Sequence, residues 1–264
     1  MIALGGGVAC DVTGFLASVY MRGVDVIQIP TTVLAQVDAA IGGKTGVNLR
    51  SGKNLVGTFH QPRAVLIDPA VLATLPSREY RAGLYESLKC GIIGDSALFE
   101  LFERRRREIL DREPGVMEEV IARSARLKAS VVSADEREGG LRQVLNLGHT
   151  IGHALEAETR YTQLLHGEAV AWGMIAATNI AVAIGKLEAM AGERIANAVR
   201  GLGRLPKMKF KVAGVLKRLH SDKKTRRGVV HFVLPREIGK VEIVADVPLE
   251  VVQWAAEEVR KMAV

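Results

Sequence analysis

Three of the six histidines in the chain, His149, His153 and His166, lie within eighteen positions. His149 and His153 are four residues apart, so they share one face if the segment is a helix. Two histidines and one glutamate form a common catalytic zinc set that leaves coordination positions open for substrate or water. Glu86 is the candidate carboxylate. An HxxxH pair also arises by chance, and histidines cap helices or satisfy core hydrogen bonds, so the spacing alone leaves metal binding and a structural role both open.

Cationic and amide side chains accompany these histidines. Lys89 follows Glu86 by three residues, about one helical turn, and Arg142 and Asn146 come shortly before His149. Cations around a metal would form a pocket for a phosphate or a carboxylate. Taken singly, a surface lysine is usually just a solvated group. The set comprises Lys44, Lys53, Asn54, Lys89, Lys128, Arg142 and Asn146.

A glycine turn, Gly5-Gly6-Gly7, follows the apolar run at residues 2–4 and precedes helical spacing over residues 8–19. Such a turn lets backbone approach a pyrophosphate, whose charge the helix N-terminus favours. The turn does not complete the GxGxxG pattern, because Cys10 stands at the last glycine position. A nucleotide site and a simple tight turn both remain open on this signal.

The elements that must position these groups change character along the chain. Short apolar runs at 2–4, 24–29 and 65–67 alternate with helical spacing at 8–19 and 33–41, which predicts a doubly wound parallel sheet. Thr31 and Thr32 are candidate caps for the second helix. A parallel sheet needs several strands with both faces covered, so we expect that the opening strands of this sheet are missing, rather than that it is unusually small.

After Pro76 the spacing is helical to about residue 203, with breaks at 111–114, 138–140 and 160–164. A two-stranded ribbon at 229–234 and 241–244 and a last helix from about 248 complete the chain. The predicted fold class is therefore α/β plus all-α. A partial doubly wound parallel-sheet, nucleotide-binding domain spans residues 1–76, and a mainly helical metal- and substrate-binding domain spans residues 77–264.

The composition, with 48% apolar and 25% charged residues over 264 positions, is that of a globular protein with a sizeable core. The net charge of +7 fits nucleic acid, an anionic surface or a small acidic substrate. The densest basic run, 104–107, is bracketed by Glu103 and Glu108 and indicates a solvated helix face, so we expect no nucleic-acid partner. Cys10 and Cys90 lack disulfide or CxxC spacing, which indicates a reducing compartment.

The chain shows no secretory signal pattern at its start, and the apolar stretch 169–185 contains Trp172, Thr178 and Asn179. That stretch falls short of a comfortable membrane span and predicts a buried core helix. We therefore expect a cytoplasmic protein without a membrane partner.

Several segments resemble the 3-dehydroquinate synthase family from end to end: GGGVACDVTGF, RGVDVIQIPTTVLAQVDAAIGGKTGVNLRSGKN, GLYESLKCGII, ADEREGGLRQVLNLGHTIGHALEAE and LLHGEAVAWGM. Cyclases that make deoxy-inosose or valiolone rings share much of this pattern, and glycerol dehydrogenases are more distant. The resemblance implies NAD and Zn²⁺ as cofactors, with Co²⁺ as an alternative metal. The implied substrate is a phosphorylated C7 sugar acid, 3-deoxy-D-arabino-heptulosonate 7-phosphate, and the products are 3-dehydroquinate and phosphate of the shikimate pathway. It also implies a homodimer, and residues 1–76 become part of an NAD-binding domain whose first portion is lacking.

The resemblance carries site residues over position by position. It implies that the metal ligands are Glu86, His149 and His166. The positions that hold NAD are Gly6, Gly7, Val8, Asp11, Thr31, Thr32, Lys44, Lys53 and Thr74. The catalytic and substrate positions are Arg22, Asp38, Lys44, Asn54, Lys89, Lys128, Glu138, Arg142, Asn146 and His153, with the pair Lys223-Lys224 also reaching the substrate.

Three alternatives stay open beside this interpretation. A related sugar-phosphate cyclase would close a different ring, and an NAD-dependent polyol dehydrogenase would release its NADH. The cationic residues Lys44 and Arg142 favour a phosphorylated substrate over a polyol. The third alternative is a folded but inactive fragment that cannot hold NAD, which titration with NAD separates from the enzymes.

Overall fold

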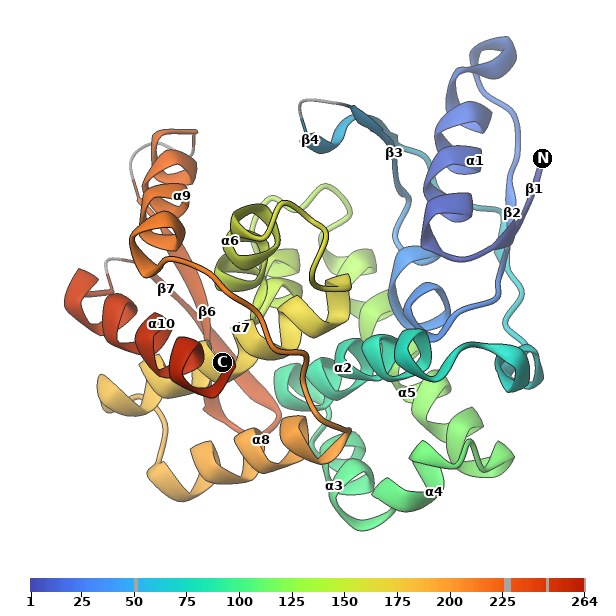
Figure 1. The fold of residues 1–264 in the computed structure, drawn as a ribbon. Helices are drawn as coiled ribbons and strands as arrows, with labels where there is room; N and C mark the ends of the chain where they lie inside the picture. Colours follow the sequence, from blue (N-terminus) through green and yellow to red (C-terminus); the bar gives the residue numbers. More distant parts are fainter. Residues whose placement is uncertain (50–51, 226–228, 246, 264) are drawn as a thin grey trace. The chain divides into compact units, whose positions relative to one another are not determined.

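The computed structural model describes residues 1–49, 52–225, 229–245 and 247–263, with the backbone alone for residues 52–54 and 221–225 (Figure 1). The chain forms two compact units. The first consists of Met1–Ser87 with Arg107–Arg142, and the second of Leu88–Arg106 with Gln143–Val264.

The first unit contains a parallel sheet of three short strands in the order β1 (Ile2–Gly5), β2 (Ile27–Pro30) and β5 (Ala64–Val65). Ile2 pairs with Ile27, which in turn pairs with Ala64. Helix α1 (Gly7–Val19) follows β1 and buries its small residues Cys10, Gly14 and Ala17. The strand–helix–strand alternation expected from the sequence is confirmed. The short turn η1 (Tyr20–Arg22) follows α1. β2 begins three residues later than the apolar run suggested, at Ile27, where the pairing with β1 starts.

The segment after β2 departs from a regular helix. Thr32 caps it as expected, since its Oγ1 accepts a hydrogen bond from the Ala35 amide at 3.1 Å. The helix then widens into a single π-helical stretch, η2 (Ala35–Ala39), which carries Asp38. π-Turns of this kind are frequently found at functional sites.

The stretch from Lys44 to Phe59, for which the apolar spacing predicts neither a helix nor a strand, is an antiparallel hairpin of β3 (Lys44–Leu49) and β4 (Gly52–Phe59). Thr45 Oγ1 lies 2.9 Å from both the carbonyl oxygen and the hydroxyl of Thr58, which reinforces the pairing. Glycine and asparagine interrupt the apolar alternation in both strands, so the sequence pattern of a strand is weak here.

Helices complete the first unit. η3 (Pro69–Thr74) leads into α2 (Ser77–Gly94), and α5 (Pro114–Ala134) packs against η2 and η3. The short α4 (Arg106–Leu110) ends at a turn where Arg112 has a φ of 63°. The Arg112 guanidinium donates to the carbonyls of Leu72, Ala73 and Leu75 at 2.6–2.7 Å and lies 4.5 Å from the Tyr80 ring centroid. It therefore ties the end of η3 to the α4–α5 turn.

The second unit is mainly helical around α7 (His166–Ala183), which is buried along most of its length. α7 packs against α6 (His149–Glu158), α8 (Ala189–Gly201) and α10 (Leu249–Ala263), and the ribbon of β6 (His231–Glu237) and β7 (Lys240–Ala245) also meets it through β6. The remaining elements are α3 (Ser96–Arg104), η4 (Leu141–Asn146) and α9 (Val212–Thr225). The expected core helix and ribbon are both present.

Among the described residues, no helix combines the length and the apolar character that crossing a membrane requires. Cys10 and Cys90 are both buried free thiols. The doubly wound α/β piece and the mainly helical part are thus as the sequence predicts. α2 begins directly after Pro76, where the α/β pattern of the sequence ends, although the compact units divide this helix after Ser87.

Candidate active site

The second unit brings His149, His153 and His166 together, with ligand atoms that all lie within 4.8 Å of one another. His149 and His153 project from the first turns of α6, and His166 is the first residue of α7. The ring centroids are 5.1 to 5.8 Å apart. Three imidazoles at this separation can ligate a single metal ion.

α6 and α7 approach closely because glycines line their contact. A Cβ on Gly173 would lie 1.8 Å from the Gly148 carbonyl oxygen, and a Cβ on Gly152 would lie 3.0 Å from that of Ala169. Backbone therefore packs on backbone between the two helices. This contact sets the separation of the histidines at their ends.

Outer hydrogen bonds orient two of the rings. Nδ1 of His149 lies 3.2 Å from the Leu147 carbonyl oxygen, which can only accept, so this nitrogen carries the proton and Nε2 keeps its lone pair. Nδ1 of His166 lies 3.5 Å from the carboxylate of Glu156, a buried side chain on α6. Carbonyl and carboxylate partners of this kind fix the tautomer of metal-binding histidines.

The surroundings of His149 favour its neutral form. Burial of the ring, reinforced by the positive charge of Lys89 and by the other two histidines, holds the pKa of His149 well below its ordinary value. Neutral imidazole is the form that binds metal. The donor set, the ring tautomers and the charge state thus all fit a divalent ion.

Glu86 and Lys89 lie one turn apart on α2. Both are almost fully buried, at 1% and 2% exposure, which is rare for ionisable side chains. Glu86 is the second-last residue of the first unit in this helix, whereas Lys89 belongs to the second unit with the histidines.

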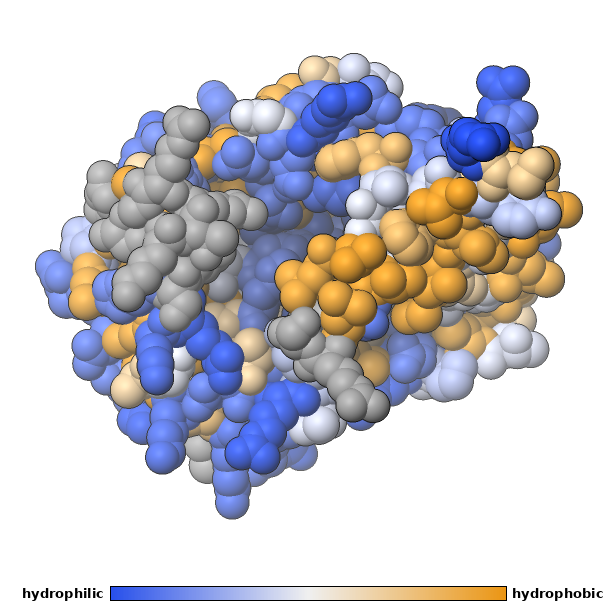
Figure 2. Space-filling model, turned by 90° about the horizontal axis from the view of Figure 1, so that it is seen from above, coloured by the Kyte–Doolittle hydropathy of each residue, from blue (hydrophilic) through white to orange (hydrophobic). Residues whose placement is uncertain are grey.

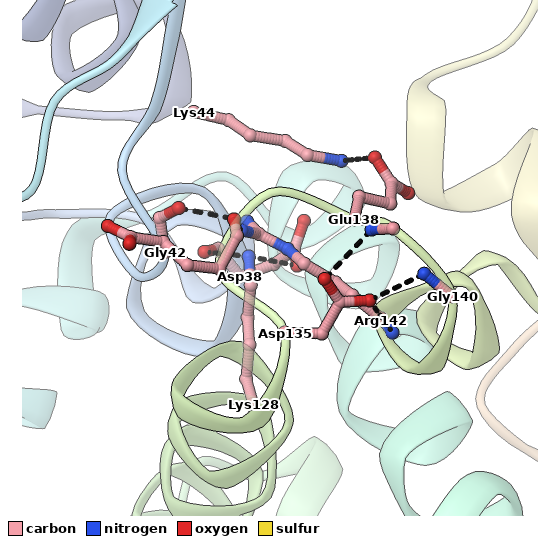
Figure 3. A network of polar contacts seen from close by, with 10 residues as sticks. Asp38, Gly42, Lys44, Lys128, Asp135, Glu138, Gly140 and Arg142 are labelled. Atoms are coloured by element: carbon pink, nitrogen blue, oxygen red, sulfur yellow. Dashed lines mark hydrogen bonds and ion pairs between the residues drawn. The ribbon is translucent and has the colours of Figure 1, made fainter.

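The first unit holds a cavity of about 410 Å³ lined by Asp11 of α1, Asp38 of η2, Lys128 of α5 and both strands of the β3–β4 hairpin, including Lys44. Lys128 Nζ lies 2.5 Å from the Asp38 carboxylate and also donates to the Asp38 carbonyl (Figure 3). Burial and the neighbouring Asp38 charge raise the pKa of Asp11 to about 6, against the lowering effect of Lys128. Burial and the charge of Asp11 likewise raise the pKa of the Cys10 thiol to about 11.

A polar network beside this cavity fixes the 135–142 loop (Figure 3). The Asp135 carboxylate accepts from the amides of Gly139, Gly140 and Arg142 at 2.8 to 3.0 Å, and these bonds, that of Arg142 first, lower its pKa. The Arg142 guanidinium is 1% exposed and donates to the carbonyls of Gly42 and Glu136. In this structure two guanidinium nitrogens of Arg142 are therefore hydrogen-bonded to backbone carbonyl groups.

Lys44 reaches the same loop. Its Nζ lies 2.5 Å from the Glu138 carboxylate, and Glu138 has a positive φ of 59°. Two residues assigned to the substrate by resemblance thus form an ion pair, and one of them, Lys44, lines the cavity.

The glycine turn lies at the carboxyl ends of β1 and β2, where a doubly wound sheet binds nucleotides. Gly5 has a φ of +154°, and a Cβ on Gly6 would come within 3.0 Å of the Thr32 methyl group. The Thr31 amide donates to the Gly5 carbonyl at 2.8 Å. α1 has no side-chain cap, which leaves the first amides of the helix facing outward for an anion.

The structure does not gather every predicted residue around these sites. Arg22 is exposed at the turn after α1, with a φ of 68°, and does not line the cavity. Val8 is exposed on α1, Thr74 is exposed at the end of η3, and Asn146 ends η4. The side chains of Lys53, Asn54, Lys223 and Lys224 lie outside the described residues.

Sequence reasoning missed two carboxylates. Asp135 accepts hydrogen bonds from backbone amides of the loop that carries Glu138 and Arg142. The carboxylate of Glu156 lies 3.5 Å from Nδ1 of His166. Asp135 precedes a Gly139-Gly140 pair, a turn signal that points to such a role. Glu156 carries no comparable signal, because its ten-residue distance from His166 is closed only by the α6–α7 loop.

The chain resembles known proteins along nearly its whole length. The family profile of the 3-dehydroquinate synthase N-terminal domain matches residues 1–82, and that of the C-terminal domain matches residues 83–225. The 3-dehydroquinate synthase of Koribacter versatilis (strain Ellin345) is 57% identical over 261 residues, which are 99% of this chain and 71% of the relative. That of Solibacter usitatus (strain Ellin6076) is 55% identical over 94% of this chain and 70% of the relative.

Solved structures extend the likeness to neighbouring cyclases. The 2-epi-5-epi-valiolone synthase ValA of Streptomyces hygroscopicus subsp. jinggangensis 5008, with NAD⁺ and Zn²⁺ bound, has a TM-score of 0.91 at 34% identity over 98% of this chain and 73% of its own. A 2-deoxy-scyllo-inosose synthase in complex with carbaglucose-6-phosphate, NAD⁺ and Co²⁺ has a TM-score of 0.85 at 29% identity, with the same coverage. Two matching domain profiles and these identities show that the chain belongs to the 3-dehydroquinate synthase family.

Proposed function

We propose that this chain provides the active site that converts 3-deoxy-D-arabino-heptulosonate 7-phosphate into 3-dehydroquinate and phosphate. The carrying observation is the cluster of His149, His153 and His166, in which outer hydrogen bonds orient His149 and His166, in a chain of the 3-dehydroquinate synthase family. The NAD⁺ and the Zn²⁺ or Co²⁺ in related cyclases support the same two cofactors here.

The metal ligands in this proposal are His149, His166 and Glu86. The first two have the outer hydrogen bonds of metal-binding histidines, and Glu86 is a buried carboxylate one turn from Lys89, whose charge acts on His149. His153 is the most exposed ring of the cluster, which supports a role in contacting the substrate.

A bound NAD would supply reversible hydride transfer at C5 of the substrate, and a bound metal would supply polarisation of the hydroxyl groups there. The residues of this chain orient the substrate and balance its charge. Lys44 and Lys128 lie at a cavity large enough for a small sugar acid and present cations to its phosphate and carboxylate. His153 and Lys89 stabilise negative charge on oxygen as protons leave, which is a preorganised electrostatic role.

The NAD-binding residues of the proposal are those around the glycine turn: Gly6, Gly7, Val8, Asp11, Thr31 and Thr32, with Lys44, Lys53 and Thr74. The outward-facing amides of α1 would receive the pyrophosphate. The remaining proposed substrate residues are Asp38, Asn54, Glu138, Arg142 and Asn146. Asp38 is paired with Lys128, and Arg142 holds the carbonyl of Gly42, two residues before β3. Arg22 is proposed for the substrate on family resemblance alone.

The proposal is tested first by metal content. The chain, freed of chelator and supplied with Zn²⁺, should retain about one equivalent. His149→Ala should lose most of it, whereas His231→Ala, which removes an exposed histidine of β6 outside the cluster, should not. Equal metal content in both variants would overturn the assignment of the cluster.

Catalysis is tested by release of phosphate from the C7 substrate in the presence of NAD and Zn²⁺. Stoichiometric phosphate and 3-dehydroquinate support the proposal. A chain that binds metal and NAD but releases NADH instead of phosphate would be a polyol dehydrogenase, and one that cyclises a different sugar phosphate would be a related cyclase. Cytoplasmic location and a homodimer are part of the proposal on family resemblance, and the free buried thiols support the former.

A further inference from the structure

Much of the positive charge of the chain is concentrated in one stretch. Residues 194–221 contain eight lysines and arginines and no acidic residue. Two of these cations are neutralised, because Arg194 pairs with Glu103 at 2.6 Å and Arg218 pairs with Glu158 at 3.3 Å. Between them lies a group without an ion-pair partner among the described residues: Arg200, Arg204, Lys207, Lys209 and Lys211.

This group sits on a strap, residues 203–211, that joins α8 to α9 in an extended conformation (Figure 1). The strap is held in place at two points. Trp172 Nε1 of α7 donates to the Pro206 carbonyl at 3.4 Å, and the Met208 amide donates to the Ala263 carbonyl at the end of α10 at 2.9 Å. Leu205 and Met208 are buried while the lysines are exposed.

A cavity of about 370 Å³ opens at the start of the strap. Its lining combines the apolar side chains of Trp172, Leu205 and Met262 with the cations Arg200, Arg204 and Lys207, and is completed by Gly203. Of the described residues that line it, none is acidic. The carboxylate of Glu258, one turn before Met262 on α10, is already paired with Lys261 at 2.7 Å.

The cavity is separate from the histidine cluster. Trp172 follows His166 by six residues on α7, and a rotation of about 100° per residue places the two side chains on different faces of this helix. Arg200 has an ordinary explanation as a cation in the last turn of α8. Arg204 and Lys207 lie beyond the helix and have no such structural role.

We propose that this cavity binds a small organic anion with at least two phosphate or carboxylate groups and a flat or apolar body. Two arginines present planar pairs of donors that match phosphate and carboxylate oxygens, and Lys207 adds a third charge. The indole and the side chains of Leu205 and Met262 would cover the apolar part. The bound anion would contact α7, the helix that begins with His166, through Trp172, and would not contact the metal ligands.

The test uses the two tryptophans of the chain. In a Trp254→Phe background, Trp172 is the only indole, so its fluorescence reports on this cavity. Titration with ATP, which has an aromatic body and a triphosphate, should change that fluorescence saturably and in a salt-sensitive manner. Inorganic pyrophosphate should compete for the same site.

Arg204→Gln/Lys207→Gln should weaken ATP binding by at least about tenfold, the effect expected from the loss of two charge-assisted hydrogen bonds. Arg104→Gln, which changes an exposed arginine of α3 that is paired with Glu100, is the matched control and should leave it unchanged. Circular dichroism verifies that the variants fold. No saturable change at millimolar ATP, or equal affinity in the double variant and the control, would overturn the proposal.

Discussion

At the scale of single residues, the histidine cluster depends on groups that the sequence does not reveal. The histidines themselves were predicted from their types and the HxxxH spacing. Glu156, which lies behind His166, was not, because helical periodicity says nothing about contacts that a loop closes. Histidine orientation at a metal is usually fixed by such outer carboxylates, and their loss typically weakens metal binding 10- to 100-fold.

We therefore expect Glu156→Gln to weaken Co²⁺ affinity by about 10- to 100-fold, because the neutral amide holds the His166 proton less firmly. The measurement is titration of the metal-free chain, followed by the visible absorption of bound Co²⁺. Glu158→Gln, two residues further along α6 and paired with Arg218, should bind Co²⁺ as the parent does. Equal affinities in both variants would show that Glu156 only fills space.

A second residue-scale prediction concerns Asp11, whose pKa is raised to about 6 in the folded chain by burial and by Asp38. A raised carboxyl pKa favours the folded state below pH 4 and loses that contribution as the pH rises through about 6. Asp11→Asn should therefore stabilise the chain at pH 8, by at most about 3 kcal/mol, and hardly at all at pH 4. Urea unfolding at the two pH values measures this. An equal effect at both would contradict the raised pKa.

At the scale of elements, the apolar spacing and the capping residues predicted the helices and strands that depend on local sequence. The strand and helix that flank the glycine turn, the capping by Thr32 and the buried α7 all follow from apolar spacing and caps. The β3–β4 hairpin could not be predicted in this way, because its strands carry glycine and asparagine and are held by cross-strand pairs such as Thr45 with Thr58. The π-helical stretch at Asp38 likewise reflects packing on α5, which no periodicity encodes.

The α4–α5 turn supplies an element-scale prediction. Arg112→Ala should lower the free energy of unfolding by about 2–4 kcal/mol, because three carbonyls of η3 and the following residue lose their common donor. Arg107→Ala, an almost fully exposed arginine nearby, should stay within about 0.5 kcal/mol of the parent. Chemical denaturation measures the free energy of unfolding of both variants. Similar decreases in the two variants would show that the hydrogen bonds of Arg112 do not stabilise the fold.

At the scale of the whole molecule, the first unit exposes many large apolar side chains. Val8, Val12, Leu16 and Val19 form an exposed stripe on α1, and Ile2, Leu4, Leu55, Val56 and Phe59 are exposed on β1 and β4. Hydrophobic side chains gather on the corresponding side of the space-filling view (Figure 2). The chain spans about 71% of its Koribacter relative, and parallel sheets normally have both faces covered.

Exposed patches of this kind promote association. We expect the isolated chain to self-associate in a concentration-dependent way, and Val12→Lys/Leu16→Lys on α1 to reduce this strongly. Sedimentation velocity over a range of protein concentrations is the measurement. Met190→Lys, which changes an even more exposed apolar residue of α8, is the control. If Met190→Lys had the same effect, the stripe on α1 would not be the surface responsible.

The backbone contact between Gly173 and Gly148 restricts which versions of this chain can exist in nature. Every amino acid other than glycine has a Cβ, so any missense change at codon 173 would place a Cβ 1.8 Å from the Gly148 carbonyl oxygen. α6 and α7 would have to separate, and the histidines at their ends would separate with them. Gly173, which is not among the proposed metal ligands, should therefore tolerate substitution as poorly as the histidines do. In a library of single substitutions sorted for metal retention, codon 173 should be as depleted of variants as codons 149 and 166.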